Sequence, residues 1–71
     1  MVSNMSVRND YEIIGWVRLT ESGELKANGV NVKNGNGYFI YNNMRYRPGV
    51  YWLIRRHGRT FLISDEFLNS M

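Results

Sequence analysis

Residues 38–64 read YFIYNNMRYRPGVYWLIRRHGRTFLIS, and this stretch decides the fold. Short runs of aromatic and β-branched residues alternate with the turn-forming pairs Asn42-Asn43, Pro48-Gly49 and His57-Gly58. Such runs are typical of short antiparallel strands, because side chains of these types pack well on a pleated surface. We therefore expect two consecutive β-hairpins with two-residue turns at Asn42-Asn43 and His57-Gly58.

The first hairpin is predicted to have two unlike faces. Its turn places Ile40 opposite Arg45, and alternation along the strands then assigns each side chain to a face. The face expected to join the core carries Phe39, Tyr41, Met44 and Tyr46. The opposite face is an aromatic and cationic surface made of Tyr38, Ile40, Arg45 and Arg47.

The second hairpin is predicted to have an apolar stem and a cationic tip. One stem face carries Trp52, Ile54, Phe61 and Ile63, and the other carries Tyr51, Leu53 and Leu62. Such a stem belongs at the centre of a fold or in an interface, so we expect Ile54 and Phe61 in the core. At the tip the turn places Arg56 opposite Arg59, and a bound anion would relieve this repulsion.

Outside these hairpins the sequence predicts further strands and a short terminal helix. The expected strands lie at residues 12–19, 24–32, 37–41, 44–47, 50–56 and 60–64. Asn28-Gly29 is expected to break the second strand or to form a bulge, since glycine inside a strand marks an irregularity. Ser64 can cap a helix that runs through Met71, with Asp65 and Glu66 in its first turn.

The predicted fold class is therefore mostly β. We expect a small antiparallel meander, or an SH3-like or Greek-key barrel, of about five to six short strands with a short C-terminal helix. Residues 1–10 are expected to form a flexible N-terminal segment, and residues 11–71 a single small β domain.

Size and composition limit how such a domain is stabilised. A chain of 71 residues has room for one hydrophobic core. It contains no cysteine and one histidine, so we expect no disulfide, no metal and no cofactor. Stability is then expected to come from packing the ten aromatic residues, with self-association into a homodimer as an alternative.

No targeting or membrane segment is predicted. The first ten residues are polar and lack the apolar stretch of a signal peptide. No apolar run approaches the roughly 20 residues that a membrane span requires. We therefore expect a cytoplasmic protein that does not enter a membrane.

Positive charge is concentrated in the middle of the chain. Residues 31–60 contain six basic residues and no acidic one, although the formal net charge of the whole chain is only +3. Five of the six are arginine, whose planar guanidinium donates paired hydrogen bonds to phosphate and stacks on flat rings. The expected nucleic-acid-binding residues are Lys33, Tyr38, Arg45, Arg47, Arg55, Arg56, His57 and Arg59.

These residues predict a small non-enzymatic nucleic-acid-binding module with a regulatory or accessory role. Arginine would contact phosphates and exposed tyrosine would contact bases, with either DNA or RNA as the partner. The alternative is a protein-interaction module or small inhibitor that dimerises or binds an acidic partner through arginine, Tyr46, Tyr51 and Trp52. A further alternative is a domain whose aromatics are core and whose arginines only keep it soluble.

Catalysis has little support in the sequence. No acid or nucleophile is arranged near His57, so we assign no catalytic residue. A small ribonuclease-like activity, with groups brought together by the fold, is the enzymatic alternative.

Overall fold

A computed structural model describes residues 11–70 of the chain. The N-terminal segment predicted for residues 1–10 lies outside the described residues, as does Met71 at the end of the predicted helix. The described part forms seven strands and one helix. In chain order they are β1 (Glu12–Leu19), β2 (Leu25–Asn28), β3 (Lys33–Asn34), β4 (Phe39–Tyr41), β5 (Met44–Tyr46), β6 (Gly49–Arg56), β7 (Arg59–Ser64) and α2 (Asp65–Asn69).

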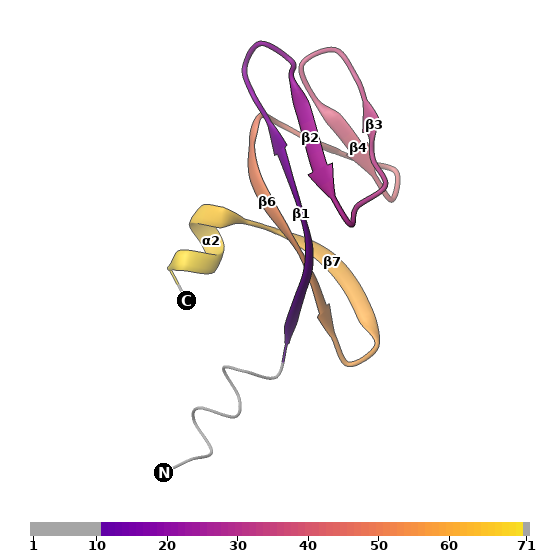
Figure 1. Ribbon diagram of the computed structural model, residues 1–71, viewed down its shortest axis with the longest axis vertical. Coiled ribbons are helices and arrows are strands. Elements are labelled where there is room, and N and C mark those ends of the chain that lie inside the picture. The colour runs from indigo at the N-terminus through magenta and orange to yellow at the C-terminus, as the bar shows by residue number, and fades with distance from the viewer. Residues whose placement is uncertain (1–10, 71) are drawn as a thin grey trace.

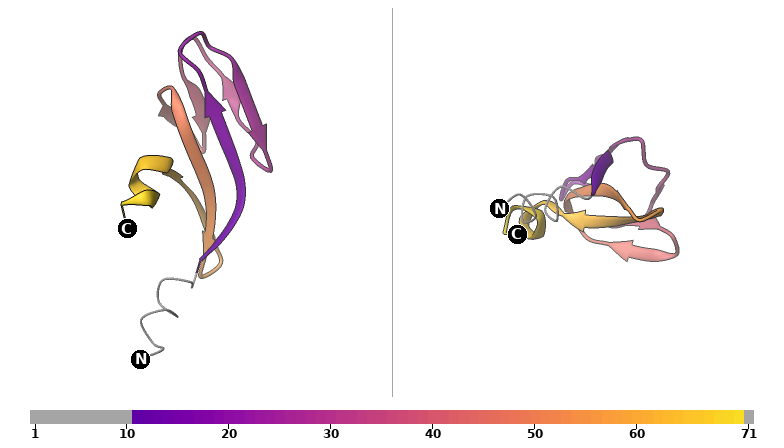
Figure 2. Two further views of the ribbon diagram at one scale, coloured as in Figure 1. Left: turned by 60° about the vertical axis from the view of Figure 1, so that its left-hand side comes forward. Right: turned by 90° about the horizontal axis from the view of Figure 1, so that it is seen from below.

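The strands form two antiparallel sheets (Figure 1). The larger sheet has the strand order β2-β1-β6-β7, and the smaller one has the order β3-β4-β5. The smaller sheet lies beside β1 and β2 at one end of the molecule, as two further views confirm (Figure 2). The predicted mostly β fold is therefore confirmed, with seven strands in residues 11–70 where about five to six were expected.

Both hairpins have the predicted turns and registers. Asn42 and Asn43 have φ angles of 53° and 64°, and His57 and Gly58 have φ angles of 53° and 77°. Two consecutive residues with positive φ make the type I′ turn, whose twist matches that of the flanking strands. The pairs that result are those expected, Ile40 with Arg45 in one hairpin and Arg56 with Arg59 in the other.

The predicted strand 24–32 forms only over residues 25–28, and the additional strand, β3, begins beyond its expected end, at Lys33. Gly29 adopts a φ of 77°, and a Cβ there would lie 2.7 Å from the carbonyl oxygen of Ile14. A Cβ at Gly15 would likewise lie 2.7 Å from the carbonyl oxygen of Asn28. Two glycines thus let the backbones approach closely, and the chain leaves the larger sheet after Asn28 and enters the smaller one at Lys33.

The core lies between the two sheets. Its buried centre consists of Val17, Leu19 and Phe39, whose side chains are at most 2% exposed. The Phe39 ring stacks on Tyr46 with a centroid distance of 5.0 Å and meets the edge of Tyr51 at 5.5 Å. Aromatic contacts of this geometry stabilise a core beyond the area that they bury.

Two residues predicted for the core are exposed instead. Met44 is 60% exposed, because it lies beside the turn at the end of the short β4–β5 hairpin. Phe61 is 39% exposed, because β7 is the edge strand of its sheet. The central strand β6 behaves as predicted, since Leu53 and Ile54 are buried on opposite faces.

The terminal helix is capped and anchored as a short extension of β7. The Ser64 Oγ accepts a hydrogen bond from the Phe67 N–H at 3.1 Å, which confirms the predicted N-cap. The Trp52 Nε1–H donates to Asp65 Oδ1 at 2.8 Å and ties the helix to β6. No helix within residues 11–70 has the length and apolar character needed to cross a membrane.

Candidate functional site

The eight residues predicted to bind nucleic acid form two groups. Lys33, Tyr38, Arg45 and Arg47 belong to the smaller sheet and its flanks, whereas Arg55, Arg56, His57 and Arg59 surround the turn between β6 and β7. That turn lies at the end of the β6–β7 hairpin that points away from the smaller sheet (Figures 1 and 2). The structure therefore brings the residues together in two clusters and not on one continuous surface.

The first cluster lies on the outward face of the smaller sheet. Lys33 pairs with Ile40, and Ile40 pairs with Arg45, so the three form a row across β3, β4 and β5. Alternation points this row away from Phe39, which is fully buried. The Arg45 guanidinium lies over the Tyr38 ring, with its Cζ atom 4.9 Å from the ring centroid. We call Lys33, Tyr38, Ile40, Arg45 and Arg47 the sheet cluster.

The glycine-rich loop between β3 and β4 positions Tyr38. The Gly35 N–H donates to the Tyr38 carbonyl oxygen at 2.7 Å and closes the turn. A Cβ at Gly35 would overlap the Tyr38 ring, so the ring lies where only glycine leaves room for it. The sequence predicted this segment to be a turn; the structure adds that the turn holds the aromatic ring of the sheet cluster.

Carboxylates of the described residues do not neutralise the basic residues of the sheet cluster. Residues 31–60 contain no acidic residue, and no carboxylate within residues 11–70 forms an ion pair with Lys33, Arg45 or Arg47. All three of these basic residues are exposed. Their charges therefore add to one another and produce a positive potential over this face.

The second cluster, at the β6–β7 turn, is partly compensated. Arg55 Nη2 and Nε lie 2.9 Å and 3.3 Å from Glu12 Oε1 across the β1–β6 ladder. Arg56 and His57 also make interactions within the chain. Sequence reasoning missed Glu12 because it lies 43 residues from Arg55, and only the pairing of β1 with β6 joins them.

The aromatic residues expected to serve as interface anchors, Tyr46, Tyr51 and Trp52, instead make contacts within the chain. Tyr46 and Tyr51 pack against the buried core, and their rings meet edge to face at 5.3 Å. Burial is the main reason that the pKa of the Tyr46 hydroxyl is raised above 10.0, with smaller contributions from Tyr41 and Tyr51. Trp52 is partly buried and hydrogen-bonded to Asp65.

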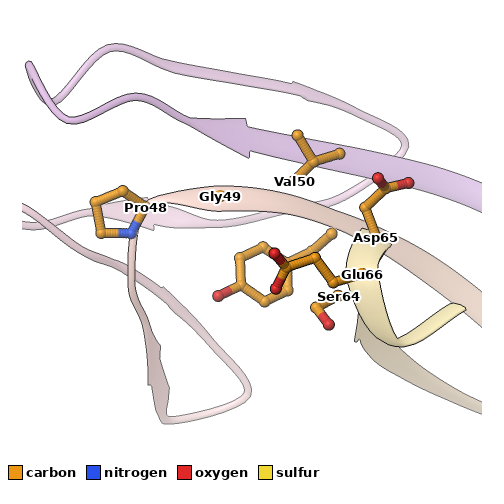
Figure 3. Close-up of a pocket in the computed structure, with 7 residues that line it drawn as sticks. Pro48, Gly49, Val50, Ser64, Asp65 and Glu66 are labelled. Atoms are coloured by element: carbon orange, nitrogen blue, oxygen red, sulfur yellow. The ribbon is translucent and has the colours of Figure 1, made fainter. Parts of the chain in front are cut away.

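A shallow cleft of about 260 Å³ lies between the start of β6 and the start of α2 (Figure 3). Pro48, Gly49 and Val50 line one side, and Ser64, Asp65 and Glu66 line the other. Its two carboxylates disfavour phosphate. The end of β7 that leads into α2 is therefore negatively charged, whereas the turn that precedes β7 is positively charged.

Comparison with other proteins adds no constraint on the site. No protein-family model, no curated protein and no solved structure matches the chain. Within residues 11–70, no group of three histidine, aspartate or glutamate side chains is arranged to hold a metal ion. Function is therefore inferred from geometry and charge.

Proposed function

We propose that the protein is a small non-enzymatic module that binds nucleic acid through the sheet cluster. The observation that supports this most directly is the row of Lys33, Ile40 and Arg45, with Arg45 over Tyr38, whose basic residues form no ion pair with a carboxylate of residues 11–70. Exposed sheets that combine cations with aromatic rings are a common platform for single-stranded nucleic acid.

Each member of the cluster has a chemical role in this proposal. Lys33, Arg45 and Arg47 contact phosphates, because their charges are exposed and no carboxylate of residues 11–70 competes for them. The Arg45 guanidinium and the Tyr38 ring form a layered surface on which a base can stack. Ile40 supplies an apolar contact between the two basic residues of the row.

The turn cluster of Arg55, Arg56, His57 and Arg59 is a second, weaker contact in this proposal. The turn cluster lies at the end of the β6–β7 hairpin that is remote from the sheet cluster (Figure 1). A nucleic-acid strand must therefore extend along the molecule to contact both clusters. Glu12 offsets the charge of Arg55, so Arg55 contributes less than Arg45.

Fluorescence anisotropy across a salt series tests the proposal. The probes are single-stranded RNA, single-stranded DNA and duplex DNA, and the test variant combines Lys33→Ala with Arg45→Ala. Losing two phosphate contacts lowers the slope of log affinity against log salt by about 1.4 for single strands, since each contact contributes about 0.7. The matched control is Arg18→Ala, an exposed arginine on β1 in the other sheet.

The outcomes distinguish a cluster that binds nucleic acid from one whose charges only keep the protein soluble. We expect the double variant to weaken binding while circular dichroism and thermal melting stay close to those of the unmodified protein. Affinity that does not change with salt contradicts the proposal, as does an Arg18→Ala variant that loses as much affinity as the double variant.

A second candidate function, a protein-interaction module or small inhibitor, is favoured by one observation. Several large apolar side chains of the larger sheet and its helix are exposed, namely Ile13, Val50, Phe61 and Phe67. Light scattering after size exclusion, together with the ultraviolet absorbance of the purified sample, distinguishes the two. Co-purified nucleic acid supports the first candidate, and a nucleic-acid-free complex that buries the apolar residues supports the second.

A further inference from the structure

The strand β7 lies at one edge of the larger sheet and is paired on one side only. Within residues 11–70, no strand pairs with its other edge. In a hairpin with a two-residue turn, the residues that flank the turn bond to each other, so Arg59, Phe61 and Ile63 bond to β6. The backbone groups of Thr60 and Leu62 and the N–H of Ser64 therefore point to the open side, whereas the Ser64 carbonyl belongs to the first turn of α2.

This edge lacks the features by which proteins usually protect an exposed strand. It spans six residues without proline or lysine, and its register with β6 is free of bulges. The other edge strands are shorter and each carries an exposed basic residue: β2 has four residues with Lys26, β5 has three with Arg45, and β3 has two with Lys33. An unprotected apolar edge is the natural place for a further strand to pair.

The charges along β7 indicate which strand fits. Arg59 stands at the beginning of β7, and Asp65 and Glu66 follow its end. In an antiparallel pair the second strand runs in the opposite direction, so a copy of β7 places its acidic end beside Arg59 and its own Arg59 beside the acidic end. An acidic partner would match only one end of this strand, and a basic partner only the other.

We propose that two copies of the chain form a dimer by antiparallel pairing of β7 with β7 about a twofold axis at Leu62. This register pairs Thr60 with Ser64 of the second copy, so the outward backbone groups of both strands meet. It also places Phe61 beside Ile63 of the second copy and brings Arg59 to the acidic start of the second copy's α2, at Asp65 and Glu66. The exposed Phe61 side chain, wrongly predicted to lie in the core of one chain, is covered by the second.

The symmetry follows from the strand itself. A twofold contact requires one surface that is complementary to itself, and β7 meets this requirement in both its hydrogen-bonding groups and its charges. The two sheets join into one continuous sheet of eight strands. The inference does not depend on nucleic-acid binding by the sheet cluster, which lies on the other sheet; Arg59 is also part of the turn cluster, so the dimer is tested with nucleic-acid-free protein.

Sedimentation velocity over a concentration series, with nucleic-acid-free protein, tests the dimer. The unmodified chain is expected to shift from monomer to dimer as its concentration rises. Arg59→Glu is expected to weaken dimerisation about tenfold or more, since the change acts twice across the axis. Adding Glu66→Lys to Arg59→Glu places a positive charge at the opposite end, next to the Asp65 that remains, and is expected to recover part of the loss. Arg18→Glu makes the same charge change away from β7 and serves as the control.

A backbone variant supplies an independent test. Thr60→Pro removes an outward N–H from β7 without removing a bond to β6, so it is expected to give a folded monomer. If circular dichroism shows that this variant does not fold, the charge series alone decides. An unmodified chain that stays monomeric at every concentration overturns the proposal, as does a dimer that Arg59→Glu and Arg18→Glu weaken equally.

Discussion

The two hairpins have the same turn geometry and end in very different surroundings. Both contain a two-residue turn with positive φ, and both are rich in aromatic and basic residues. In the β4–β5 hairpin, one face packs Phe39 into the core and the other presents Arg45 and Ile40 outward. In the β6–β7 hairpin, β6 contributes one buried residue to each face, Leu53 and Ile54, whereas β7 lies at an edge with Phe61 exposed.

This difference shows that turn chemistry specifies a hairpin but not what its faces contact. Each hairpin contains one edge strand, β5 or β7. The edge strand β5 carries Arg45, a charged residue of the kind that discourages further pairing. The edge strand β7 is apolar between its charged ends, so we expect the first hairpin to present a surface for anions and the second to pair with another strand.

The largest effect is expected where the first hairpin enters the core. Phe39→Ala removes a fully buried ring and its stacking on Tyr46, so it is expected to cost about 3–5 kcal/mol of unfolding free energy. Phe61→Ala, in the second hairpin, should cost well under half of that at concentrations where the chain is monomeric. Urea unfolding followed by tryptophan fluorescence measures both, and equal losses would mean that the two hairpins are buried alike.

A smaller effect is expected at the turns. Gly58 has a φ of 77° with open space around its missing Cβ, so Gly58→Ala should cost about 1–2 kcal/mol through the backbone alone. Urea unfolding of the variant provides the check. A stabilising Gly58→Ala would contradict the type I′ turn.

Tyr46, on the core-facing side of the first hairpin, is expected to make the stability of the fold depend on pH. Burial raises the pKa of Tyr46 in the folded protein, so above pH 10 the unfolded chain releases this proton more readily than the folded one. The contribution of Tyr46 is therefore complete below pH 10 and is lost as the pH rises through its raised pKa. Tyr46→Phe should reduce the fall in stability above pH 10, measured by urea unfolding at a series of pH values. An unchanged profile would show that Tyr46 ionises normally.

The smallest effect is expected for the Glu12–Arg55 ion pair, close to the β6–β7 turn. The Glu12–Arg55 pair is half exposed or more on both sides, so Glu12→Gln should change stability by less than about 1 kcal/mol. It also leaves Arg55 uncompensated, which should raise oligonucleotide affinity at low salt if the turn cluster contacts nucleic acid. Anisotropy with and without Arg55→Ala isolates this contribution. If neither Glu12→Gln nor Arg55→Ala changes the affinity, nucleic acid binds through the sheet cluster and not through the turn cluster.

Much of the fold could be predicted because its determinants are local. The turn pairs, the register of both hairpins and the Ser64 cap depend on residues a few positions apart, and all were predicted correctly. The composition of the sheet cluster followed from the same alternation, since residues spaced by two share a face. Whether these residues bind nucleic acid stays a prediction.

The amino-acid sequence by itself determined most of the strands, the turns of both hairpins and the concentration of positive charge in residues 31–60, because propensity, alternation and turn chemistry act over short distances. Only the tertiary structure decided that β7 lies at an edge, that Glu12 reaches Arg55, and that the basic residues separate into two clusters. These outcomes depend on which distant strands pair, and Gly15 and Gly29 allow the close approach that sends the chain from one sheet to the other. Burial and charge compensation are properties of that arrangement, and no short stretch of sequence contains them.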